Sequence, residues 1–198
     1  MQAWTRPEIL AHPNIPKPLH GMNPRTLLGR EWWDKHRQEA YAKYDYHCWA
    51  CGVAKRDAKY HQWLEGHEYY DFNYDTGELK LKEIVALCHS CHNFIHSGRL
   101  WIMFQKGEIP REKIEDILAY GFAVLKPTGI KPFFGTILIS ELLAGTDEAI
   151  EMRNAYRQGS GYDNGDDLEW NEWHLNINGV KYYSQFKNEV EWYMHYNS

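Results

Sequence analysis

The pattern of apolar and polar positions predicts helices and strands in the first half of the chain. In residues 30–44, aromatic and apolar side chains recur at helical spacing among good helix formers. Residues 64–73 are rich in tyrosine and phenylalanine, and residues 78–87 alternate before they become continuously apolar. An Asp-Thr-Gly sequence between these two segments supplies turn chemistry. The two segments therefore predict a β-hairpin.

The pattern in the second half of the chain predicts helices followed by another hairpin. Pro110 precedes a segment with one apolar stripe, and two more helices are expected over 134–144 and 147–158. Residues 159–168 have the composition of a linker. Beyond them, an Asn-Gly dipeptide between alternating runs predicts a two-residue type I′ turn, and a last helix closes the chain.

The first 29 residues contain five of the eight prolines. Proline removes a backbone donor and disfavours helix at the residue before it, so the sequence predicts an extended arm over 1–29. Arg6, Lys17 and Arg25 make DNA contact one interpretation of this arm. Local packing through its few apolar side chains is the other.

Composition and charge are those of an ordinary globular protein, with 43% hydrophobic and 25% charged residues and a net charge of −5. This excludes a uniformly basic nucleic-acid coat. The charge is nevertheless uneven, because residues 1–60 carry a net charge of +4 and residues 133–198 a net charge of −7. We expect the basic N-terminal half to contact DNA. The acidic last third fits a protein partner or a self-association surface better.

The four cysteines form two Cys-x-x-Cys pairs, Cys48 with Cys51 and Cys88 with Cys91. Residues 1–20 lack the apolar core of a signal peptide, and no apolar run is long enough to cross a membrane. A cytoplasmic protein keeps its thiols reduced, so the pairs predict one four-thiolate zinc site. Two separate free or redox-active pairs are the alternative.

Histidines near these cysteines suggest a second site. His92 and His96 are four residues apart in the helix that the second cysteine pair opens, so they share one face and can clasp a divalent ion. Histidine also titrates near neutral pH and can deprotonate water, which makes His67 on the first strand a candidate general base. His89 or His92 as a zinc ligand is unnecessary beside four thiolates. The remaining histidines receive no role: His12, His20, His36, His47, His61, His174 and His195.

The run CWACG…LEGHEYYDF…IVALCHSCHNFIH resembles HNH endonucleases that carry a four-cysteine zinc site, which are ββα-metal nucleases. The resemblance covers about residues 30–98. It implies a structural zinc ion that fixes the hairpin and helix, and a separate catalytic divalent metal, magnesium or alternatively manganese. The implied host is a bacterial cell or a phage-infected one.

The chain departs from the family pattern at two positions. The family base usually follows a metal-binding residue, but here Gly66 precedes His67 and Glu68 follows it. Either His67 is the base and Glu68 assists or binds metal, or His67 binds metal and Glu68 is the base. The first is favoured because a carboxyl with an ordinary pKa of about 4.3 accepts protons poorly at pH 7. Glu83 lies near the position of the family's central asparagine and is expected to orient His67.

Together these features predict an α+β fold, with a ββα-metal core and structural zinc followed by helices and a C-terminal β-hairpin plus helix. The expected divisions are an arm over 1–29, the nuclease domain over 30–98, a helical extension over 99–158 and an appendage over 169–198. The predicted activity is metal-dependent hydrolysis of DNA. A zinc-stabilised binding module that has lost the chemistry is the alternative, and RNA is the alternative substrate.

Overall fold

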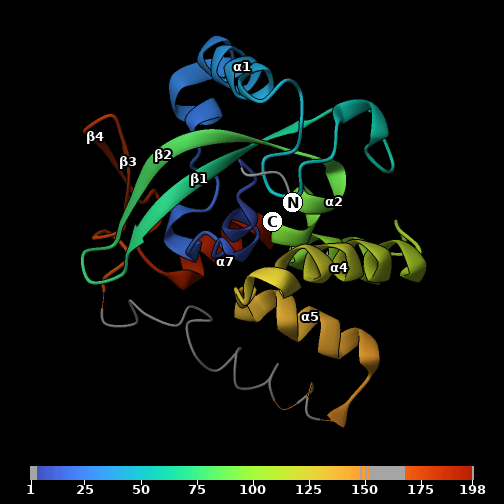
Figure 1. Cartoon of the computed structure of the whole chain (residues 1–198). Coiled ribbons are helices and arrows are strands. Elements are labelled where there is room, and N and C mark those ends of the chain that lie inside the picture. The colour runs from blue at the N-terminus through green and yellow to red at the C-terminus, as the bar shows by residue number, and fades with distance from the viewer. Residues whose placement is uncertain (1–3, 148, 150, 152–167, 198) are drawn as a thin grey trace. The chain divides into compact units, whose positions relative to one another are not determined.

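A computed structural model describes residues 4–147, 149, 151 and 168–197 (Figure 1). Contacts divide the chain into two compact units. The first takes the described parts of 1–14, 37–67 and 84–155, and the second those of 15–36, 68–83 and 156–198. The fold is mixed α+β, as predicted, with one four-stranded sheet of order β1-β2-β3-β4.

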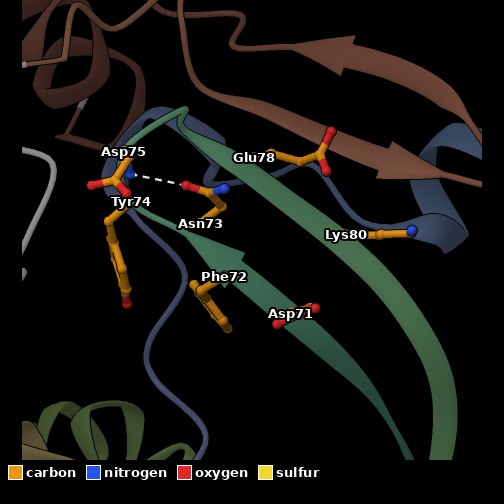
Figure 2. A pocket seen from close by; sticks show the side chains of 7 residues that line it. All are labelled: Asp71, Phe72, Asn73, Tyr74, Asp75, Glu78 and Lys80. Atoms are coloured by element: carbon orange, nitrogen blue, oxygen red, sulfur yellow. Dashed lines mark hydrogen bonds between the residues drawn. The ribbon is translucent and has the colours of Figure 1, made fainter.

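Strands β1 (Glu65–Asn73) and β2 (Glu78–Leu87) form the predicted hairpin. The turn between them is stabilised by Asn73, whose Oδ1 accepts hydrogen bonds from the backbone N–H groups of Asp75 (3.1 Å) and Thr76 (3.2 Å). Figure 2 shows the first of these bonds, at the edge of a pocket along the hairpin end. The unit boundary crosses both strands, so the hairpin supplies residues to each unit.

The first unit contains the helices that follow the second cysteine pair. These are α2 (His89–Ile95), α3 (Ser97–Gln105), α4 (Arg111–Leu125) and α5 (Phe134–Ala144), with short 3-10 helices at Lys55–Asp57 and Lys126–Thr128. The helices expected after the second cysteine pair, after Pro110 and over 134–144 are confirmed. The helix and linker expected over 147–168 fall almost entirely outside the described residues. The buried side chains include Phe94, Ile114 and Ile117.

The expected extended arm over 1–29 is wrong. Its prolines begin 3-10 helices at Pro7–Ala11 and Lys17–Leu19, because proline is well tolerated in the first turn, where its missing N–H costs nothing. Ile9 and Leu10 are fully buried. Helix α1 (Pro24–Lys43) then starts earlier than the predicted helix, and its backbone breaks at Gly29, where φ is 88°.

The C-terminal residues complete the second unit. Strands β3 (His174–Ile177) and β4 (Val180–Tyr183) meet at the predicted type I′ turn, where φ is 53° at Asn178 and 85° at Gly179. Helix α7 (Glu189–Asn197) follows.

This hairpin belongs to the sheet and is not an appendage. Strand β3 pairs in parallel with β2, with Glu78 opposite His174. Trp173 and Leu175 share a buried cluster with Leu19 and Leu79. The Trp192 indole N–H donates to His20 Nδ1 at 3.1 Å. Among the described residues, no helix has the length and apolar character needed to cross a membrane.

Candidate metal centres

The four-cysteine cluster consists of Cys48, Cys51, Cys88 and Cys91. The first pair lies in a tight turn after α1, and the second lies at the N-terminus of α2. One sulfur from each residue lies within 4.8 Å of all the others. The Cys51 and Cys88 sulfurs are 3.8 Å apart, too far for a disulfide bond of about 2.05 Å. Tetrahedral zinc with Zn–S bonds of about 2.3 Å sets its sulfurs about 3.8 Å apart, so the cluster fits zinc.

The electrostatics of the cluster also favour a bound cation. The pKa of the Cys51 thiol lies far below its ordinary value because Cys48, Cys88 and Cys91 donate to its sulfur, together with the Tyr120 hydroxyl. The pKa of Cys91 is raised, because its hydrogen bonds with Cys48, Cys51 and Cys88 and its burial all favour the protonated thiol. The cage therefore stabilises one thiolate easily but not four. A divalent ion reverses this balance and allows all four thiols to ionise.

A three-histidine centre lies beside this cluster in the same unit. It is formed by His67 on β1, His92 on α2 and His96 at the end of α2. Ring centroids are 5.6 Å apart for His67 and His92, 5.1 Å for His67 and His96, and 4.6 Å for the two helix residues. The His12 ring also lies 5.4 Å from the His67 ring.

His67 is the buried member of this centre. Neither of its ring nitrogens has a hydrogen-bond partner among the described residues, although both are enclosed. Burial lowers its pKa well below the usual value, and the neighbouring His96, His92 and His12 act in the same direction. Burial likewise lowers the pKa of His96 to about 3. Both imidazoles are therefore neutral at pH 7, which is the form that binds metals.

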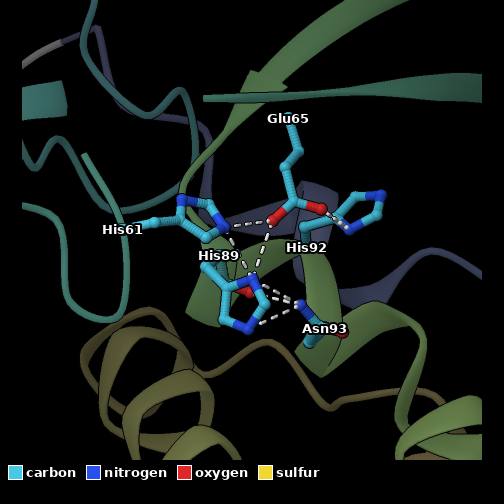
Figure 3. Close-up of polar contacts among 5 residues, drawn as sticks. All are labelled: His61, Glu65, His89, His92 and Asn93. Carbon is cyan, nitrogen blue, oxygen red and sulfur yellow. Dashed lines mark hydrogen bonds and ion pairs between the residues drawn. The ribbon is translucent and has the colours of Figure 1, made fainter. Parts of the chain in front are cut away.

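Glu65 connects this centre to two further histidines (Figure 3). Its Oε2 lies 2.7 Å from His92 Nδ1, while its Oε1 lies 2.8 Å from His89 Nδ1 and 3.0 Å from His61 Nε2. Burial alone would raise the pKa of Glu65, but hydrogen bonds from His89 and His92 outweigh it and leave the pKa below its usual value. Because Nδ1 of His92 lies against this carboxylate, Nε2 is the nitrogen left for a metal.

The structure brings together His67, His92 and His96 but not all the residues expected at the site. Glu68 follows His67 in β1, and strand alternation directs it to the opposite face. Neither Glu68 nor Glu83 belongs to a metal-compatible group among the described residues. That Glu83 orients His67 stays a prediction; among the described residues the His67 nitrogens have no hydrogen-bond partner. The role of His67 as a base remains a prediction.

The sequence analysis missed Glu65, His61, His89 and the neighbourhood of His12. Two signals were available: Glu65 and His67 are two apart on one strand and share a face, and His89 and His92 are three apart on one helix. His61 lies in a loop without periodicity, so only the fold brings it to Glu65.

No protein-family model matches this sequence, and the comparisons with curated proteins and with solved structures also gave no match. Functional interpretation therefore rests on the geometry of these centres and on the sequence motif.

Proposed function

We propose that the protein is a metal-dependent endonuclease whose catalytic ion is held by His67, His92 and His96. The observation that carries this proposal is the state of His67. Buried ring nitrogens without partners cost free energy, and an ion bound between the three imidazoles would satisfy one of the two His67 nitrogens. The resemblance of the surrounding motif to HNH endonucleases supplies the reaction class.

Phosphodiester hydrolysis requires an activated water molecule and positive charge at the phosphate. A divalent ion in the three-histidine centre would supply both. The protein's own part is to hold and orient. Zinc in the four-cysteine cluster fixes the start of α2, and this helix carries His92. Glu65 then fixes which nitrogen of His92 faces the ion.

Burial favours His67 as a metal ligand, which is one part of the second assignment given above. A general base must exchange its proton with water, whereas the His67 ring is 4% exposed and resists protonation. The proposal gives Glu68 and Glu83 no part at this ion.

The donor set also bears on which metal is used. Magnesium prefers oxygen ligands, whereas imidazole suits zinc, nickel, iron and copper. Three imidazoles therefore favour a transition metal over the magnesium expected from the motif.

DNA is the proposed substrate because a cationic side chain lies close to the three-histidine centre, where the positive charge of Arg99 helps to lower the pKa of His96. Arg99 and Lys113 line a pocket of about 330 Å³ together with Glu65 and His89. Lysine and arginine neutralise phosphates and release counterions, which favours nucleic-acid binding.

Plasmid cleavage by the purified protein tests the proposal. Wild-type protein is supplied with Mn²⁺, Co²⁺, Ni²⁺ or Mg²⁺, and conversion of supercoiled DNA is followed on a gel. His67→Ala and His96→Ala should each lower the rate by about 100-fold or more, because each removes a metal ligand. His36→Ala is the matched control, since His36 lies on α1 and caps the Trp32 carbonyl.

Two results would contradict the proposal. One is cleavage that His67→Ala and His96→Ala leave unchanged. The other is the absence of cleavage by wild-type protein with every metal. If that inactive protein still binds DNA tightly, the alternative function, a zinc-stabilised binding module, is the correct one.

A further inference from the structure

We propose that His61, Glu65 and His89 form a second, separate site for a divalent transition-metal ion. Three atoms that carry lone pairs meet at this triad. Nε2 of His61 lies 3.0 Å from Oε1 of Glu65, Oε1 lies 2.8 Å from Nδ1 of His89, and the two nitrogens are 2.9 Å apart. Figure 3 shows this triangle between the β1 strand, the preceding loop and α2.

Protons alone cannot satisfy this triangle. If both imidazole nitrogens are protonated and donate to Oε1 of Glu65, two N–H groups face each other at 2.9 Å. If one of the two nitrogens is unprotonated, its lone pair faces the carboxylate oxygen of Glu65, and the two repel each other. With the Glu65 carboxyl ionised, every arrangement of protons on the two imidazoles leaves one edge of the triangle repulsive. A cation attracts all three lone pairs at once.

The size of the triangle matches a metal site. Ions bound at about 2.1 Å in octahedral geometry set neighbouring ligand atoms about 3.0 Å apart. The three edges of 2.8, 2.9 and 3.0 Å fit one triangular face of such an octahedron. Two histidines and one carboxylate arranged on one face form a known class of site for divalent transition metals, with the opposite positions open.

The surroundings hold the ligands in place. The His61 ring stacks on Trp63 with centroids 3.6 Å apart and planes at 1°. The Asn93 amide donates to the His89 backbone carbonyl at 2.9 Å and lies at similar distances from the two ring nitrogens, 3.1 and 3.4 Å. It therefore does not lie along the Nδ1 lone pair. All three ligands have mostly buried side chains, of which His61 is 12% exposed.

The open positions of the proposed ion would face the pocket of about 330 Å³. Arg99 and Lys113 line this pocket, so water or an anionic oxygen ligand fits beside the ion. Glu65 uses one oxygen for the triad and the other for His92, and it therefore links the two histidine sites through one carboxylate.

Counting metal ions tests the inference. The full-length protein, with its four-cysteine cluster loaded with zinc, is incubated with Ni²⁺ and dialysed. Nickel and zinc per chain are then measured by mass spectrometry. Wild-type protein should retain one nickel ion more than His61→Ala, whereas His36→Ala should retain the wild-type number. His96→Ala empties only the three-histidine centre, and the double variant His61→Ala with His96→Ala should lose both ions.

The inference is overturned if His61→Ala retains as much nickel as wild-type protein. Retained zinc and an unchanged circular dichroism spectrum show that His61→Ala is folded. If that variant loses its zinc, His61→Gln removes the imidazole but keeps a polar side chain, and it must show the same loss of nickel. The experiment counts ions and not cleaved DNA. Loss of nickel in His61→Ala but not in His96→Ala would therefore support this site while contradicting the catalytic centre proposed above.

Discussion

Single residues outside the ligand sets contact the candidate metal ligands. Tyr120 on α4 donates its hydroxyl proton to the Cys51 sulfur. Such outer contacts stabilise the charged form of a ligand and fix its direction. Glu65 acts in the same way on His92.

Replacement of Tyr120 by phenylalanine tests this contact. Tyr120→Phe should weaken zinc affinity by about 10-fold, because the Cys51 thiolate loses one hydrogen bond in a site shielded from water. Competition with a coloured chelator measures the affinity. Tyr193→Phe on the exposed face of α7 is the matched control. An affinity of Tyr120→Phe equal to that of the control would show that the hydroxyl contributes nothing to zinc binding.

At the scale of the residue, the sequence identified cysteines and histidines that can bind a metal, but not the residues that these side chains contact. The cysteine pairs and the spacing of His92 and His96 are local signals, so they were found. The network around Glu65 combines a loop, a strand and a helix, and no local pattern encodes that meeting.

Among the elements, the contact between α2 and α4 matters most for the centres. Gly121 of α4 faces Phe94 of α2, and a Cβ atom added at Gly121 would lie 2.1 Å from the Phe94 ring. The same ring packs edge-to-face on Phe122 with centroids 5.3 Å apart. The absence of a side chain at Gly121 thus allows the helix that carries Cys91, His92 and His96 to pack closely against α4.

Gly121→Ala should therefore destabilise the protein by about 1–3 kcal/mol, because the buried Phe94 ring must move. Chemical denaturation measures this change in the free energy of unfolding. Gly98→Ala is the control: Gly98 lies in α3, and an added Cβ meets nothing within 4 Å. Alanine there should be neutral or stabilising, by up to about 1 kcal/mol. Equal effects of the two substitutions would contradict the proposed packing.

Periodicity predicted the elements whose patterns are long or have clear turns, such as the β1–β2 hairpin, α4 and the Asn178-Gly179 turn. Periodicity did not predict the elements whose structure depends on tertiary contacts. The prolines of the first 29 residues indicate only where helix is disfavoured, and they do not show that Ile9 and Leu10 are buried. Strand β3 is four residues long, and its pairing with β2 is set by a shared core.

On the scale of the whole molecule, the two units should respond differently to metal. All three candidate metal centres lie in the first unit, while the second unit is built on the hydrophobic cluster around Leu79 and Trp173. Stripping zinc with a strong chelator should unfold the region around the four-cysteine cluster, because the two cysteine pairs lose the metal that links them.

Hydrogen exchange read by mass spectrometry measures that response. Without zinc, amide protection should fall in residues 47–54 and 88–96, while the β3–β4 hairpin should keep its protection. Adding zinc back should restore the original pattern. A uniform loss of protection across both units would show instead that they unfold as one.

The parallel pairing of β2 with β3 also has a consequence for synthesis of the chain. Glu78 meets His174 and Asn176 across separations of 96 and 98 residues, and Trp192 meets His20 across 172. Contacts so distant in sequence form slowly, because a long loop must close first. As the chain emerges from the ribosome, both cysteine pairs are available by residue 91, but residues 15–36 must wait for nearly the last residue to find their partners. The nascent chain therefore presents all four cysteines of the candidate metal site well before its second core can close.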